Sequence, residues 1–194
     1  MNRIKRAAVT AAALALTVCP AGVAAARATG RHTVTFTSTF NDEGTRASFS
    51  PDCDGHPRGD NVIVYEGTAT FAGDLTAVDD YCGLLTYDVT GGSVVGEGWD
   101  TMTGSLRGCG TGTFVIHQTD YHTSAAVFDP ATGHGHLTLR WEIEPGSGTN
   151  DFAGASGSGT AYADFDPPTD PSHPVALPNH GAYTGTITCR RAPS

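Results

Sequence analysis

Apolar and polar residues alternate along most of the chain after residue 31, which is the period of a β-strand. In residues 32–40, HTVTFTSTF, Val34, Phe36 and Phe40 share one face while threonine and serine occupy the other. The same pattern predicts strands over residues 62–71, 84–90, 94–106, 111–121, 136–144, 157–165 and 182–189, with a short strand at 46–50. No stretch shows the 3.6-residue repeat of a helix. The pattern therefore predicts an all-β protein of about eight strands.

Two stretches interrupt this pattern. Residues 41–60 are rich in turn-forming residues, and residues 166–180 contain five prolines, which cannot donate to a sheet; we expect irregular loops in both. Eight antiparallel strands with short glycine-rich connections either close into an up-and-down barrel or separate into a β-sandwich. Because closure removes exposed strand edges, we predict an eight-stranded antiparallel β-barrel, with the β-sandwich as the alternative.

Residues 1–28 have the features of a secretory signal peptide. Three cations (Arg3, Lys5 and Arg6) precede an apolar run at 7–18, and small residues follow it. The apolar run is too short to span a membrane, and we expect cleavage after Ala26 or Ala28. Residues 29–194 would then form a single β-barrel domain, secreted to the extracellular space and without a membrane anchor.

The acidic charge limits the classes of partner. The chain has a formal net charge of −9, and without residues 1–28 it keeps seven arginines against 20 acidic residues, a net of −13. Such a surface repels phosphate backbones, so we expect no nucleic-acid partner. A small-molecule ligand is the partner we expect, and the sequence predicts no oligomeric state.

Four cysteines remain after the predicted leader: Cys53, Cys82, Cys109 and Cys189. An even number of cysteines in an exported chain predicts disulfide bonds, here two, and all three pairings remain open. We expect the bridges to tie strand connections together and to leave the core alone. Because the chain lacks Cys-x-x-Cys pairs, we expect no metal site, and we expect no cofactor.

A glycine-rich run at residues 144–162 is the most distinctive part of the sequence. Within it, the pattern G-T-x-x-F-x-x-A-x-G resembles that of dirigent proteins and the allene oxide cyclase barrel-like superfamily; its residues are Gly148, Thr149, Phe152, Ala155 and Gly157. The wider layout, over roughly residues 60–189, looks like small secreted actinobacterial domains of unknown function. The resemblance implies an eight-stranded antiparallel barrel. It implies no activity, because the matching residues form a turn and pack.

The interior of the barrel is the place to look for a site. Asp100 shares a face with Met102 and Leu106; if that face points inward, burial would raise the pKa of Asp100 and suit it to general acid or base chemistry. Glu66 is the second candidate carboxylate. The candidate ligand-binding residues are the large aromatic side chains Tyr65, Trp99 and Trp141.

The sequence is compatible with three functions. The first is binding of a small, partly apolar ligand inside the barrel. The second is an isomerase or cyclase of the allene oxide cyclase type, using Glu66 or Asp100. The third is a structural or interaction domain whose interior is filled by its own side chains. The sequence leaves undecided whether the protein is an enzyme.

Overall fold

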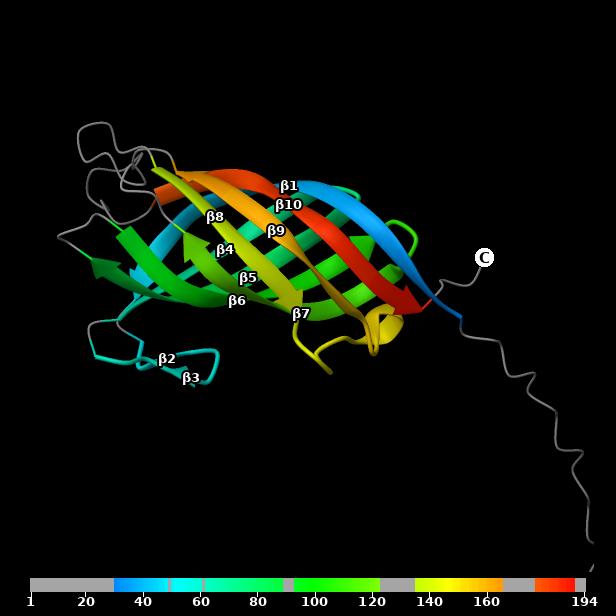
Figure 1. The fold of residues 1–194 in the computed structure, drawn as a ribbon, viewed down its shortest axis with the longest axis horizontal. Helices are drawn as coiled ribbons and strands as arrows, with labels where there is room; N and C mark the ends of the chain where they lie inside the picture. Colours follow the sequence, from blue (N-terminus) through cyan, green and yellow to red (C-terminus); the bar gives the residue numbers. More distant parts are fainter. Residues whose placement is uncertain are drawn as a thin grey trace, which may run out of the picture.

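The computed structural model describes residues 30–48, 50–60, 62–88, 93–122, 135–165 and 177–190, which form a closed barrel of eight antiparallel strands (Figure 1). Around the wall the strands follow the order β1 (Arg31–Ser48), β10 (Leu177–Arg190), β9 (Ser156–Phe165), β8 (Gly135–Ile143), β7 (Gly110–His122), β6 (Ser93–Leu106), β5 (Leu75–Asp88) and β4 (Ile63–Gly73). The predicted barrel is thus confirmed, and the β-sandwich alternative is wrong.

Pairing between the first and last strands closes the barrel. β1 runs antiparallel to β10 without interruption from Arg31↔Arg190 to Asp42↔Asn179, and the part of β1 that begins at Ser38 also pairs with β4. A register shift after Asp42 in both ladders marks an irregularity in β1. All other neighbours in the wall are consecutive along the chain, so the barrel is an up-and-down meander.

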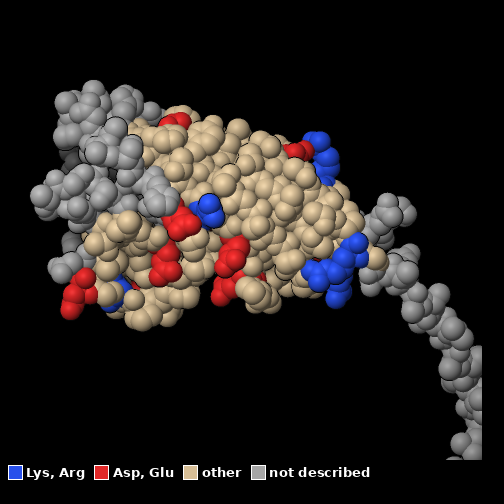
Figure 2. All heavy atoms as spheres, viewed as in Figure 1, with Lys and Arg blue, Asp and Glu red and all other residues tan. Residues whose placement is uncertain are grey.

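Alternating side chains divide each strand between a lumen face and an outer face. The lumen holds buried aromatic residues, among them Phe36 and Trp141, whose rings lie 5.6 Å apart. The outer face of β1 carries exposed threonines at 33, 35, 37 and 39. Figure 2 shows that the visible face of the molecule is mostly uncharged, with acidic and basic groups scattered over it.

One end of the barrel is closed by the short helix η1 (Asn150–Phe152) and a disulfide bond. Phe152 is fully buried and packs against Phe114, with ring centroids 4.7 Å apart. Cys109, in the β6–β7 turn, is bonded to Cys189 near the end of β10, and both sulfurs belong to the main core. We call this the η1 end of the barrel.

A small hairpin lies outside the barrel wall. It consists of β2 (Asp52–Cys53) and β3 (His56–Pro57), and Figure 1 shows it beside the wall. Cys53 is bonded to Cys82 on β5, and the His56 ring stacks on Trp99 of β6 at 3.7 Å. The hairpin therefore buries a second apolar cluster on the outer face, made of Cys53, Val64, Cys82 and Trp99.

Several sequence predictions change in detail. β1 continues to Ser48 and the β2–β3 hairpin follows, so residues 41–60 are not a simple loop. β10 begins at Leu177, so residues 177–180 of the predicted proline-rich loop are strand, while 166–176 lie outside the described residues. Cys82 is in the interior of β5, so the expectation that the bridges tie only strand connections is wrong.

Residues 1–28, the predicted signal peptide, lie outside the described residues. Cleavage after Ala26 or Ala28 therefore remains a prediction. In the part of the chain that is described, no helix has the length and hydrophobicity needed to cross a lipid bilayer.

Candidate functional site

The lumen contains a cluster of polar side chains among its aromatic residues. Six polar or charged residues are buried in the described part of the chain: Ser38, Asp42, Asp79, Asp100, Gln118 and Asn179. Three of them are aspartates, and none is a lysine or arginine. Buried carboxylates without a buried cation are costly, so their partners need to be traced one by one.

Asp100 sits in a hydrogen-bonded group that spans the lumen. The Tyr183 hydroxyl of β10 donates to Asp100 Oδ2 at 2.8 Å, and the Gln118 amide of β7 donates to the same oxygen. β10 and β6 are four strands apart in the eight-stranded ring, so Tyr183 reaches Asp100 from the opposite wall. Burial raises the pKa of Asp100 to about 7, although the bonds from Tyr183 and Gln118 act to lower it.

Asp42 forms a second group with side chains from β10 and β5. The Asn179 amide donates to Asp42 Oδ2 at 2.6 Å, and the Tyr81 hydroxyl donates to the same oxygen. The Tyr81 ring reaches Asp42 by crossing β4 over Gly67, where an added Cβ would lie 2.3 Å from the Tyr81 hydroxyl. Gly67 is therefore required by the close approach of this ring.

Asp79 on β5 is the carboxylate without a complete set of partners. Its side chain is 3% exposed, and Oδ1 has no hydrogen-bond partner. Burial raises the pKa of Asp79 well above its usual value, and repulsion from Asp100, Asp80 and Asp42 raises it further. Asp79 thus lies within electrostatic reach of the carboxylates of both hydrogen-bonded groups.

The carboxylates do not form a metal site. Among the described residues, the three side chains that bring ligand atoms within 4.8 Å of one another are His32, Cys109 and Cys189, and the two cysteines are joined in a disulfide. Asp42, Asp79 and Asp100 do not meet that distance. The lumen cluster therefore offers acceptors for hydrogen bonds, spread too widely to chelate one ion.

The structure separates the residues that the sequence proposed for the site. Asp100 and Trp141 are buried in the lumen, and Tyr65 of β4 shares their inward side but is half-buried. Glu66 is exposed on the outer face. The lumen role expected for Trp99 is wrong: Asp100 and Met102 point inward, so Trp99 points outward and is covered by the β2–β3 hairpin.

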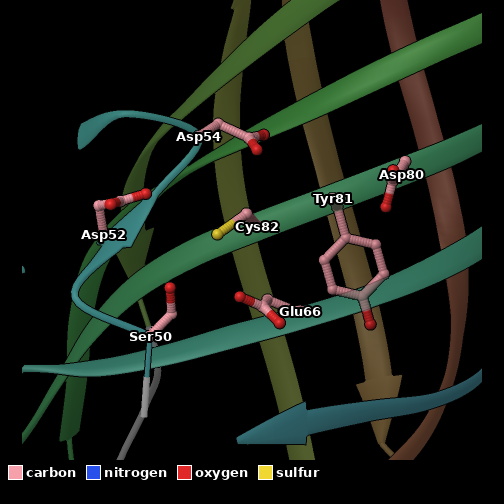
Figure 3. A pocket seen from close by; sticks show the side chains of 7 residues that line it. All are labelled: Ser50, Asp52, Asp54, Glu66, Asp80, Tyr81 and Cys82. Atoms are coloured by element: carbon pink, nitrogen blue, oxygen red, sulfur yellow. The ribbon is translucent and has the colours of Figure 1, made fainter. Parts of the chain in front are cut away.

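Glu66 belongs to a pocket between this hairpin and the outer wall (Figure 3). The pocket has a volume of about 230 Å³ and is lined by Ser50, Asp52, Asp54, Glu66, Asp80, Tyr81 and Cys82. Its four acidic side chains are all exposed to solvent. Exposed carboxylates keep their hydration, so the acidic side chains of this pocket avoid the desolvation cost of the buried aspartates.

Sequence reasoning missed Asp79 because it missed the first half of its strand. In β5, Asp79 points inward while Val78 is 56% exposed, so the usual hydrophobic pattern is inverted at these positions. The available signal was the continued alternation of Leu75, Ala77, Asp79 and Tyr81 after the Gly73–Asp74 turn. Asp42 was missed because the chain around it was predicted to be a loop.

The glycine-rich run singled out in the sequence forms the turn at the η1 end. Thr149 Oγ1 accepts a hydrogen bond from the Thr113 amide at 3.0 Å, which fixes the turn against β7. An added Cβ at Gly148 would lie 1.9 Å from the carbonyl oxygen of Phe152, so the turn requires glycine there. These residues close the barrel, and they lie outside the carboxylate cluster.

A family described as "Protein of unknown function (DUF3224)" matches residues 33–167. The chain belongs to the DUF3224 family. The matched DUF3224 segment includes Asp42, Asp79 and Asp100, whereas Asn179 and Tyr183 on β10 lie beyond it. No curated protein matches the chain.

Proposed function

We propose that the protein is secreted and that its barrel binds a small, partly apolar molecule beside Asp79. The observation that carries this proposal is Asp79 Oδ1, which is buried without a hydrogen-bond partner. Leaving a buried polar group unsatisfied costs about 1–3 kcal/mol, and more if it is charged. Groups kept at such a cost are concentrated at functional sites, where a ligand supplies the missing partner.

The surroundings of the cluster suit a ligand with both polar and apolar parts. The Tyr183 hydroxyl contacts Asp100, and its ring packs on Phe71 and Phe40, with centroids 5.2 and 5.7 Å away. Trp141 lies next along this aromatic wall, 6.4 Å from Tyr183. Polar groups set in an aromatic surface are the usual composition of small-molecule sites.

Secretion is supported by two features. Residues 1–28 have the sequence of an export signal, and the four remaining cysteines are paired in two disulfides. The disulfides are compatible with an extracellular protein, since bonds of this kind persist in oxidising compartments. N-terminal sequencing of the exported protein tests this part of the proposal, and we expect it to begin at Arg27 or Thr29.

Acid–base catalysis of the allene oxide cyclase type is the second candidate function. It is favoured by Asp100, because a pKa of about 7 lets one carboxyl both donate and accept a proton near neutral pH. The Tyr183 hydroxyl beside it provides a second proton donor. Resemblance to the allene oxide cyclase barrel-like superfamily agrees with this candidate and does not identify a substrate.

The test uses the full chain, exported so that its disulfides form. Thermal-shift screening against a small-molecule library should yield compounds that stabilise the protein, by about 2.7 kcal/mol at 100 times the dissociation constant. Asp79→Asn should lose these shifts, and the matched control Asp80→Asn, one residue away on the outer face, should keep them.

Each outcome decides between the candidates. Shifts lost in Asp79→Asn and kept in Asp80→Asn support binding in the lumen. If NMR detects a product formed from a stabilising compound, and the Asp100→Asn variant no longer forms that product, catalysis is supported. If no compound stabilises the protein, or if the shifts survive in Asp79→Asn, the proposal fails and a barrel filled by its own side chains is favoured.

A further inference from the structure

We propose that the ligand carries a protonated amine, and that this cation binds Asp79 and Asp100 from inside the barrel. The inference rests on the proposed function and names the chemistry of its ligand. It follows from the charges of the lumen, from the hydrogen-bonding capacity of the carboxylates, and from the aromatic residues next to them.

The charges of the buried side chains favour a cationic ligand. The charged side chains that are buried in the described part of the chain are all aspartates. Each arginine whose side chain is described is exposed on the surface: Arg31, Arg58, Arg107, Arg140 and Arg190. Among the described residues, Asp79 and Asp100 thus have no buried lysine or arginine to compensate them, and a cationic ligand would supply that charge.

The hydrogen bonds of the buried carboxylates favour a ligand that donates. The Tyr183 and Gln118 donors are directed at Asp100, and the Tyr81 and Asn179 donors are directed at Asp42. Asp79 Oδ1 remains as a buried acceptor with no donor. An ammonium group has three donors and no acceptor, so it complements this site, whereas a carboxylate or phosphate would be repelled by it.

The spacing of the carboxylates and the aromatic residues beside them indicate the kind of cation. The three carboxylates do not bring their oxygen atoms within 4.8 Å of one another, which disfavours a single chelated metal ion. Tyr183 donates its hydroxyl to Asp100 and packs its ring against Phe40 and Phe71. A ligand with an ammonium head and an apolar or aromatic body fits both surfaces, since aromatic faces also attract cations.

The groups that face Asp79 set the pH dependence of binding. Asp100 of β6 and Asp42 of β1 repel its charge, as does Asp80 on its own strand. Among the residues whose side chains are described, the other inward-facing titratable groups on these strands are Tyr65, Tyr81 and Tyr183, together with His32 beside the Cys109–Cys189 bond at the η1 end. Binding of an ammonium group requires ionised carboxylates, so it should release protons, and affinity should rise by up to about tenfold per pH unit for each proton released.

Three probes of similar shape and different charge test the inference. They are 2-phenylethylamine, which is cationic, 2-phenylethanol, which is neutral, and 3-phenylpropionate, which is anionic. We expect calorimetry on the exported, oxidised protein to show the tightest binding for the amine, by at least about tenfold. Its affinity should increase from about pH 5 to about pH 8, with proton release that differs between buffers of different ionisation enthalpy.

Variants locate the bound amine. Asp79→Asn and Asp100→Asn should each weaken amine binding by about tenfold or more, and Asp80→Asn should leave it within about twofold. Circular dichroism and disulfide mapping verify that each variant is folded. Asp79→Asn removes a buried carboxyl group whose ionisation is opposed by burial and by its acidic neighbours, so we expect the variant to be at least as stable as the parent protein.

The possible failures are distinguishable. If the neutral or anionic probe binds as tightly as the amine, or if amine affinity falls as pH rises, the inference is overturned and ligand binding in the lumen stands. If no probe binds while a neutral library compound does, the inference also fails and the proposed function stands. If neither the probes nor the library bind, both fail.

Discussion

Two opposing effects set the pKa of Asp100 in the lumen. Burial disfavours its charged form, while donors from Tyr183 and Gln118 favour it, and burial is the stronger effect. The folded protein therefore binds the Asp100 proton more tightly than the unfolded chain does. Between the ordinary aspartate pKa of 3.8 and the folded value of about 7, stability should decrease as pH rises, and it should level off above that range.

This effect gives a prediction for Asp100→Asn. A shift of about three pKa units corresponds to roughly 4 kcal/mol of unfolding free energy lost by the parent protein across this range. The variant should lack that part of the decline, so its stability should depend less on pH. Urea unfolding at a series of pH values measures the difference, with the exposed Asp80→Asn as the control. Parallel pH profiles for Asp100→Asn and the parent protein would contradict the predicted cause.

Gly67 allows Tyr81 to cross β4 and reach Asp42. Gly67→Ala would place a methyl group 2.3 Å from the Tyr81 hydroxyl, so the ring must move and its bond to Asp42 must break. We expect a cost of about 1–3 kcal/mol in unfolding free energy, as for other overpacked sites. In a Tyr81→Ala background the same substitution should cost much less. A double-mutant cycle measures this coupling, and additive costs would show that the contact is unimportant.

The sequence predicted the environment of some residues and missed that of others. Asp100 was predicted to be buried if its face pointed inward, because Met102 and Leu106 share that face. Tyr183, Gln118 and Asn179 gave no such signal, since their importance comes from side chains that they meet on other strands. Tyr183 reaches Asp100 across the lumen, whereas Gln118 and Asn179 meet their carboxylates on neighbouring strands. Alternation shows which side of a strand a residue occupies, and it does not show which residue it will meet.

At the scale of elements, the β2–β3 hairpin acts as a cover for part of the outer wall. It shields Trp99, and it is fastened by the Cys53–Cys82 bond and by the stacking of His56. Asp52–Cys53 and His56–Pro57 are too short to show an alternating pattern, so the sequence predicts a loop here. The outward position of Trp99 depends on this cover, which explains why a strand-by-strand analysis mistook it for a lumen residue.

The two disulfides should therefore have different effects when removed. Replacing Cys53 and Cys82 by serine opens a link between residues 29 positions apart, and chain entropy predicts a loss of about 3–4 kcal/mol. The freed hairpin should expose Trp99, which shifts its fluorescence towards the red and makes residues 50–60 sensitive to proteases. Unchanged Trp99 fluorescence would show that packing alone holds the hairpin.

The Cys109–Cys189 bond provides the matched comparison. Its residues are 80 positions apart, so replacing both by serine should cost more stability, about 4–5 kcal/mol. This bond is at the η1 end, away from the hairpin, so Trp99 should stay covered in the folded variant. Denaturant unfolding and tryptophan fluorescence, measured on both variants, separate a global loss of stability from local release of the hairpin.

For the whole molecule, closure of the eight-stranded barrel by the β1–β10 pairing is the dominant feature. Arg31 and Arg190 are opposite each other in the β1–β10 ladder, so a short linker can join these positions. A circular permutant opened at Gly55, in the hairpin outside the wall, should keep the barrel and unfold in one cooperative transition. The same permutation opened at Thr68, in the middle of β4, should fail to fold because it breaks the wall. Circular dichroism and disulfide mapping compare the two.

The pairing of β1 with β10 also orders events during synthesis. The strand made first has as its neighbour the strand made last, with every other piece of the wall produced in between. Until that final strand emerges from the ribosome, the nascent polypeptide presents an unpaired border that other chains could join. Protection by a chaperone during this interval would be most valuable at β1, which waits longest for its neighbour.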